Sequence, residues 1–85
     1  MSTTKQKLPD WFDGVLYEEG DVVKNPYSGE SIELNNVELS MYDFVMGATF
    51  VVEMGSRSEK IIKELQDGLY WFRVNNPKAY MVLLD

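Results

Sequence analysis

The segment Val37–Met54 constrains the fold of this chain more than any other, because it is apolar on almost every side of a helix. One seam at helical spacing consists of Val37, Met41, Phe44, Ala48 and Val51. The other two apolar faces consist of Tyr42, Met46 and Phe50, and of Val45, Thr49 and Val52. A helix of this kind is buried on most sides. The chain has only 85 residues, so either its other elements wrap this helix or part of the helix meets a second copy.

The ends of this helix are also marked. Asn35 is expected to cap it, and Glu38 is expected to complete a capping box. Gly55 is expected to end it. The longest apolar run, 44–54, has 11 residues, whereas a membrane span needs about 20, so we predict a buried helix. Gly47 and Ala48 would let a second backbone approach closely, and the predicted oligomer interface is Met41, Phe44, Gly47, Ala48 and Val51.

A hairpin signal precedes the helix. It begins with Val15-Leu16-Tyr17 and passes through Glu18-Glu19-Gly20 to a strand at 21–24. A turn at 25–29 follows, in which Pro26 presets φ and Gly29 can adopt the left-handed conformation. Ile32 and Leu34 then share one face of a half-buried strand. The sequence therefore predicts a short hairpin that packs against helices.

A second helix is expected after Gly55. Ser56-Arg57-Ser58-Glu59 is predicted as its capping box, and Glu59–Lys63, Lys60–Glu64 and Lys63–Asp67 are predicted ion pairs on its outer face. Gly68 is either tolerated inside this helix or ends it, and in the second case 69–84 would form another hairpin. The apolar stripe favours the helix, followed by a short last helix capped by Asn76 with Pro77 at its first position.

Length and charge limit what the chain can be. We predict a flexible N-terminal tail at 1–7 and a single domain at 8–85. The net charge is −6, and residues 8–53 hold ten carboxylates against one base. This surface argues against direct nucleic-acid binding and favours a basic protein partner. The absence of cysteine and of an N-terminal apolar stretch fits the cytoplasm.

The sequence offers no catalytic motif. It contains neither histidine nor cysteine, and it has no phosphate-binding glycine loop and no nucleophile motif. Carboxylate pairs such as Glu18 with Glu19 are interpreted as solvated acids. We therefore expect no catalytic residue, no cofactor site and no metal site, and hence a protein that is not an enzyme.

Exposed aromatic residues beside carboxylates are typical of a protein-binding patch. One of Tyr70 and Trp71 is expected to be exposed, and Asp43 is expected on the exposed edge of its helix. The predicted protein-binding residues are Tyr27, Glu18, Glu19, Asp21 and Trp71.

Several segments together resemble a family of small uncharacterised proteins from tailed phages of marine cyanobacteria. These segments are Leu8–Phe12, Tyr17–Val23, Ser28–Glu30, Glu38–Phe44 and Asn75–Asp85. The resemblance implies no activity, but it implies an infected bacterial cytoplasm as the setting. Together with the patterns above, it predicts an α+β domain, with a hairpin packed on two main helices and a short C-terminal helix, that binds a protein without catalysis. A minor structural part of a virion and an acidic mimic of DNA remain alternatives, and homo-oligomerisation stays open.

Overall fold

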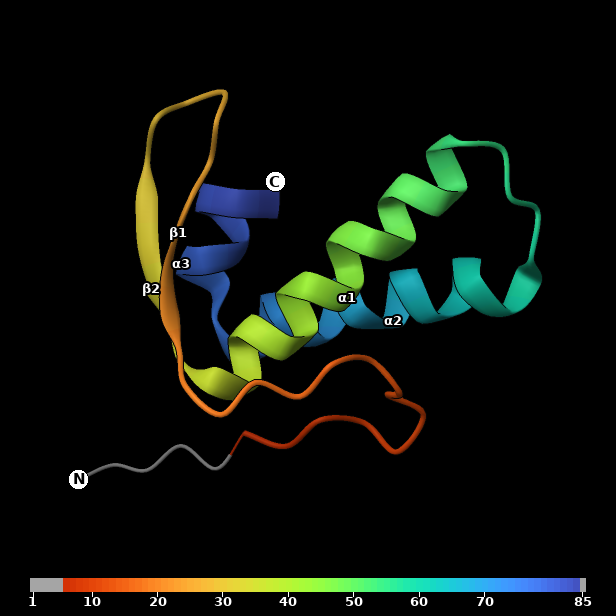
Figure 1. Cartoon of the computed structure of the whole chain (residues 1–85), viewed down its shortest axis with the longest axis horizontal. Coiled ribbons are helices and arrows are strands. Elements are labelled where there is room, and N and C mark those ends of the chain that lie inside the picture. The colour runs from red at the N-terminus through yellow and green to blue at the C-terminus, as the bar shows by residue number, and fades with distance from the viewer. Residues whose placement is uncertain (1–5, 85) are drawn as a thin grey trace.

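The computed structural model describes residues 6–84, and it confirms the predicted α+β architecture of a hairpin, two main helices and a short C-terminal helix (Figure 1). The elements are β1 (Asp21–Lys24), β2 (Ser31–Leu34), α1 (Asn36–Glu53), α2 (Glu59–Asn75), α3 (Pro77–Ala79) and a π-helical turn at Tyr80–Leu84. None of the helices between residues 6 and 84 combines the length and the apolar character that crossing a bilayer requires.

The hairpin closes as its turn residues predict. β1 and β2 are antiparallel, with Val23 opposite Ile32, and Gly29 has a φ of 80°. The Asn25 side chain accepts a hydrogen bond from the Tyr27 N–H at 2.8 Å and donates to the Val82 carbonyl at 2.8 Å. This second bond attaches the hairpin turn to the C-terminal turn.

The residues with which the hairpin signal began, Val15–Tyr17, lie outside both strands. The Tyr17 N–H donates to Ser40 Oγ at 3.0 Å, and the Tyr17 carbonyl accepts from Asn36 Nδ2 at 3.4 Å. Side chains of α1 thus form hydrogen bonds with the backbone N–H and carbonyl groups that a neighbouring strand would otherwise have paired. The consequence is a loop that lies along α1.

α1 begins and ends where the sequence predicts. Asn35 Oδ1 accepts from the Glu38 N–H at 2.8 Å, and Glu38 Oε1 accepts from the Asn35 N–H at 3.0 Å, so the capping box is complete. Gly55 follows the helix with a φ of 107°, which only glycine adopts readily. α1 buries Met41, Val45 and Ala48.

α2 is continuous through Gly68, so the alternative of a second hairpin is wrong. A Cβ at Gly68 would lie 3.0 Å from Val45 Cγ2 and 3.2 Å from Met41 Sδ. A side chain at Gly68 would therefore press on two buried side chains of α1 where α2 packs against it. The close approach expected at Gly47 concerned a second copy of the chain and stays a prediction. The predicted capping box is displaced, because Ser58 is the cap and its Oγ accepts from the Ile61 N–H at 3.3 Å, while Ser56 Oγ accepts from the Ser58 N–H.

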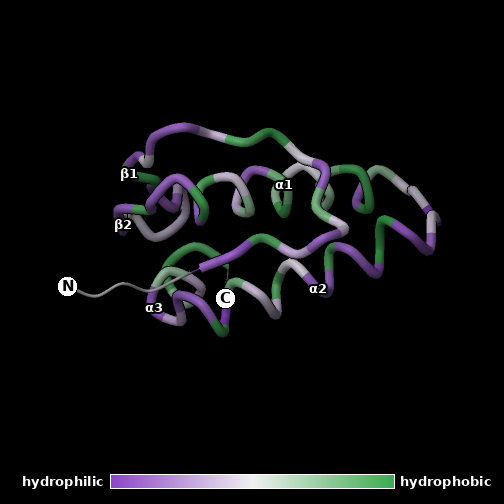
Figure 2. Tube along the Cα trace, turned by 90° about the horizontal axis from the view of Figure 1, so that it is seen from below, coloured by the Kyte–Doolittle hydropathy of each residue, from purple (hydrophilic) through white to green (hydrophobic). Residues whose placement is uncertain are grey.

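The N-terminal segment makes a U-shaped excursion along the two helices before it reaches β1 (Figures 1 and 2). Residues 1–5 of the predicted tail lie outside the described residues. The last two residues of the predicted tail contact the helices, because Gln6 Nε2 donates to Glu38 Oε2 at 2.8 Å and the Lys7 carbonyl accepts from Trp71 Nε1 at 2.9 Å. Further along, Trp11 and Phe12 pack against Phe44 with ring centroids 5.5 and 5.7 Å away.

Candidate protein-binding surface

The C-terminal half of α1 exposes a row of large apolar side chains. Met46 is 45% exposed, Phe50 63%, Val51 41% and Met54 72%. Residues 46 and 50 are four apart, so they lie on successive turns of the same side of α1, and the cap residue Met54 follows at the same spacing. We call these four residues and Gly47 the outer face of α1. The outer face thus consists of Met46, Gly47, Phe50, Val51 and Met54.

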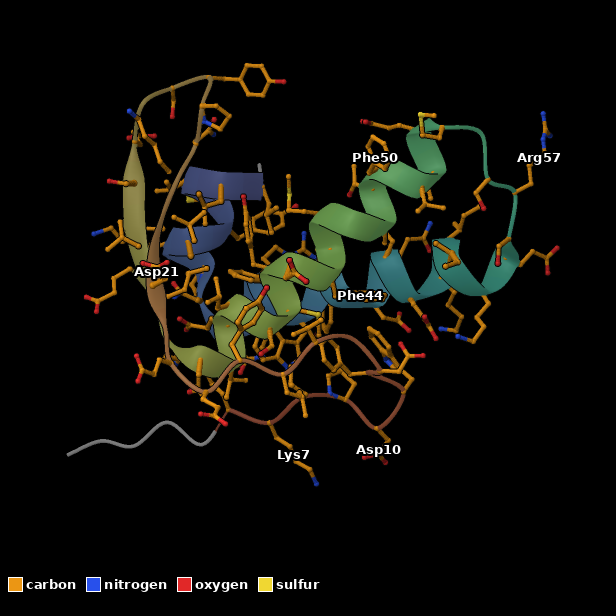
Figure 3. All side chains as sticks on the ribbon, in the orientation of Figure 1. Lys7, Asp10, Asp21, Phe44, Phe50 and Arg57 are labelled. Carbon is orange, nitrogen blue, oxygen red and sulfur yellow. The ribbon has the colours of Figure 1, made fainter. Side chains whose placement is uncertain are left out.

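The outer face is exposed because of how the other elements are distributed. The hairpin and the C-terminal turn lie near the start of α1, and the second half of α1 extends away from them beside α2 (Figure 1). α2 covers one side of α1, where Met41 and Val45 are buried. Phe50 projects from the second half of α1 and is largely exposed (Figure 3).

An apolar groove runs beside the outer face. Its volume is about 330 Å³. Phe44, Gly47, Ala48 and Val51 of α1 line it, together with Gly14 and Val15 of the N-terminal segment and Ile61 of α2. Val15 is itself exposed. The groove thus joins apolar surface of three segments that are far apart in the sequence.

Gly47 leaves the groove open. A Cβ at this position would have no heavy atom within 4 Å, and Gly47 has no left-handed φ that would require glycine. Glycine inside a helix costs about 1 kcal/mol relative to alanine. Neither packing nor backbone conformation of the described residues compensates for this cost, and the visible effect of Gly47 is to keep α1 accessible.

The only charged side chain that lines the groove is that of Asp43, and it is exposed, as predicted. The Asp43 charge raises the pKa of the Tyr17 hydroxyl, with smaller effects from burial and from a hydrogen bond between the two side chains. α1 contains three acids (Glu38, Asp43 and Glu53) and no base. The α1 wall of the groove therefore carries the negative charge of Asp43 and no positive charge.

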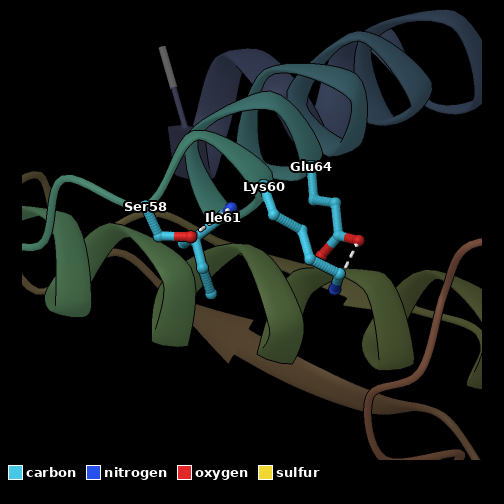
Figure 4. A network of polar contacts seen from close by, with 4 residues as sticks. All are labelled: Ser58, Lys60, Ile61 and Glu64. Atoms are coloured by element: carbon cyan, nitrogen blue, oxygen red, sulfur yellow. Dashed lines mark hydrogen bonds and ion pairs between the residues drawn. The ribbon is translucent and has the colours of Figure 1, made fainter.

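The two lysines near the start of α2 are paired within that helix. Lys60 Nζ lies 3.0 Å from Glu64 Oε2, and Lys63 Nζ lies 3.2 Å from Asp67 Oδ2, as two of the three predicted pairs require (Figure 4 shows the first). Glu64 raises the pKa of Lys60 by a hydrogen bond and by its charge, and Asp13 adds to this. Among residues 6–84, no ion pair involves Asp43.

The structure brings together most of the residues predicted for an oligomer interface. Phe44, Gly47, Ala48 and Val51 line the same groove. Met41 does not belong to it, because this side chain is fully buried against α2. The assignment of Met41 to an exposed interface was wrong. Gly68 lets α2 approach α1 closely enough to enclose the Met41 side chain.

The residues predicted for a binding patch are scattered. Tyr27 is 97% exposed at the hairpin turn, and Glu18, Glu19 and Asp21 are exposed on the adjoining loop and strand. Trp71 is a correction: it is only 8% exposed, because α2 is covered by α1 on one side and by the N-terminal segment on the other. Tyr70 is the exposed neighbour, with the Arg73 guanidinium carbon 5.7 Å from its ring centroid.

Glu18 and Glu19 instead line a second, acidic concavity with a volume of about 600 Å³. Glu33, Asn35 and Glu38 also line it. The chain crosses β2 closely here, because a Cβ at Gly20 would fall 2.0 Å from the Leu34 carbonyl oxygen. Glu38 is already bonded to neighbouring side chains, and no group of residues in the described part of the chain has the arrangement of a metal site.

Sequence reasoning missed the contribution of Val15 and Ile61 to the groove. Val15 was interpreted as part of the hairpin signal and Ile61 as part of a core stripe. The U-shaped course of the N-terminal segment brings Val15 beside α1, and the packing of α2 on α1 brings Ile61 there. The spacing of Met46, Phe50 and Met54 was a usable signal for an exposed stripe. Comparison of the chain with protein-family models, with curated proteins and with solved structures gave no match.

Proposed function

We propose that this protein acts by binding another protein through the outer face of α1 and the adjoining groove, without catalysis. The observation that carries this proposal is the row of four large apolar side chains, each at least 41% exposed, three in the C-terminal half of α1 and the fourth at its cap residue, Met54. Contiguous apolar patches of this kind, with charged residues around them, are typical of protein-interaction sites.

The charge of the surface favours a partner with basic residues. α1 has no base, and residues 8–53, which include α1 and the groove wall at Val15, hold ten acids and one base. A partner that presents lysine or arginine beside apolar residues would complement both features. Such a partner would associate faster at low ionic strength.

A second copy of this chain is a poorer match for the same reason. Two α1 helices in contact would bring the acids of one copy toward the acids of the other, and like charges at an interface oppose association. We therefore expect a monomer of 9.8 kDa in solution, and light scattering after size exclusion measures this mass.

The setting of the interaction is proposed from the sequence resemblance. A short acidic phage protein in an infected bacterial cytoplasm would act on a host protein or serve as an accessory factor. Mass spectrometry of purified particles distinguishes this role from that of a minor virion component.

The test is site-specific photo-crosslinking in a bacterial lysate. A benzoylphenylalanine at Phe50 is expected to capture a discrete partner, whereas the same group at Met81, which is comparably exposed on the C-terminal turn, is not. Phe50→Glu is expected to abolish retention of that partner, with Met81→Glu as the matched control. Equal capture from both positions would overturn the proposal.

A further inference from the structure

The groove beside α1 has the shape and charge to receive a particular kind of segment, and this inference rests on the proposed function. We propose that the groove takes an amphipathic helix of the partner, with apolar side chains near Gly47 and Val51 and a lysine or arginine at Asp43. Its walls belong to α1, to Gly14 and Val15 of the N-terminal segment and to Ile61 of α2.

The length of the groove sets the spacing of the partner residues. Asp43 and Val51 are eight residues apart on α1, which is about 12 Å along the helix axis. A helix lying along this line would place its basic residue about two turns from its far apolar residue. A partner helix can lie along this line in two directions. Apolar residues at positions i and i+4 with a base at i+8 fit one direction, and the reverse order fits the other.

The size of the groove agrees with side-chain insertion. A volume of about 330 Å³ is at the lower end of the roughly 300–1,000 Å³ found for small-molecule sites, which is enough for a few side chains of a partner. Gly47 has no Cβ, so the partner helix can approach the α1 backbone closely. Helices that place apolar anchors in a groove are a common mode of peptide recognition.

Charge complementarity selects the occupant. Asp43 is exposed, lies at one end of an otherwise apolar groove, and has no ion pair among residues 6–84. The lysines that flank Ile61 on α2, Lys60 and Lys63, are engaged by Glu64 and Asp67. A cation supplied by the partner would therefore meet the one carboxylate that lines the groove.

The probe is a pair of fluorescein-labelled, alanine-based helical peptides of sixteen residues, with leucine at i and i+4 and arginine at i+8 in one and the reversed order in the other. We expect one order to bind the full chain in an anisotropy titration, and the same peptide with a central proline to lose binding, because proline breaks the helix. Binding of neither order, or equal binding of the proline peptide, would overturn the inference.

Two variants locate the binding in the groove. Gly47→Leu fills the open space and is expected to weaken binding by at least about tenfold, as obstruction of a central contact does. Asp43→Asn is expected to weaken it about two- to fivefold, the size of an exposed ion pair, and to reduce its dependence on salt. Val22→Leu, which adds a methylene at an exposed site on β1, is the matched control and is expected to change nothing.

The failures are distinguishable. If Phe50 captures the cellular partner but Gly47→Leu leaves both partner and peptide binding intact, the outer face binds and the groove inference is wrong. If Phe50→Glu leaves the captured partner unchanged, the proposed function itself is wrong.

Discussion

The Glu38 carboxylate accepts a hydrogen bond of 3.0 Å from the Asn76 side-chain amide, which joins the first turn of α1 to the cap of α3 across 38 residues of chain. The same oxygen accepts from Gln6 at 2.8 Å, and the other oxygen accepts from the Asn35 N–H at 3.0 Å. Glu38 is buried, and this one carboxylate therefore connects three separate segments.

Removal of these bonds is expected to destabilise the domain. Hydrogen bonds to a charged group contribute about 1.5–3 kcal/mol each, and with losses that are not additive Glu38→Ala should lower the free energy of unfolding by about 3 kcal/mol. Glu38→Gln should also destabilise, because its NH₂ group would face other donors. Urea unfolding measures both, and Glu33→Ala on the exposed face of β2 is the control. A Glu38→Ala protein as stable as the control would contradict this role.

The two helical glycines are expected to respond to alanine with opposite signs. Gly47→Ala should raise the free energy of unfolding by about 0.5–1 kcal/mol, because the new methyl group meets nothing and the helix propensity improves. Gly68→Ala should lower it, because overpacking costs about 1–3 kcal/mol and the fully buried Val45 and Met41 have little room to move. Thermal or urea denaturation of the two variants measures both free energies of unfolding. If both substitutions were stabilising, α2 would have to move relative to α1 to accommodate the methyl group at position 68.

Trp71→Phe is expected to destabilise the attachment of the N-terminal segment. The Trp71 Nε1–H donates to the Lys7 carbonyl at 2.9 Å, and loss of a donor to a partly buried carbonyl costs about 1–3 kcal/mol. Tyr70→Phe is the matched control, because Tyr70 is exposed on the same helix. Unfolding midpoints that fall equally for both variants would argue against an anchoring role for this bond.

The pKa of Tyr17 reports on the charge of Asp43, the carboxylate that lines the groove. The Asp43 carboxylate raises the pKa of Tyr17 above its usual value of 10.0. The folded state thus binds this proton more tightly than the unfolded state, so the associated stability is complete below pH 10.0 and is lost as pH rises through the folded pKa. Asp43→Asn should lower the pKa of Tyr17, and NMR titration of its ring resonances measures the change. An unchanged titration curve would show that the two side chains do not interact.

Local rules predicted the elements of this fold well. The Asn35–Glu38 capping box, the turn at Gly29, the helix end at Gly55 and the Asn76-Pro77 start all depend on residues close in sequence. For the same reason, the half-buried alternation of β2 was recognisable, with Ile32 and Leu34 facing inward.

Long-range packing decided what the sequence alone did not. Whether Met41 and Trp71 face solvent depends on where α2 and the N-terminal segment lie, and a single helix pattern does not contain that information. Gln6 was assigned to a tail because it follows a polar run, yet its partners are 29 to 69 residues away. The groove residues were partly predictable from α1, but Val15 and Ile61 were not.

The distance between the Glu38 network and the outer face has a consequence for dynamics. Several hydrogen bonds that connect distant segments gather at the start of α1, whereas no side-chain hydrogen bond found among residues 6–84 involves the far end of α1, at 46–54. Amide hydrogens near Phe50 should therefore exchange with deuterium sooner than those near Met41, through opening of that end alone. A bound partner would slow this local exchange, so the exchange pattern itself would mark where the partner binds.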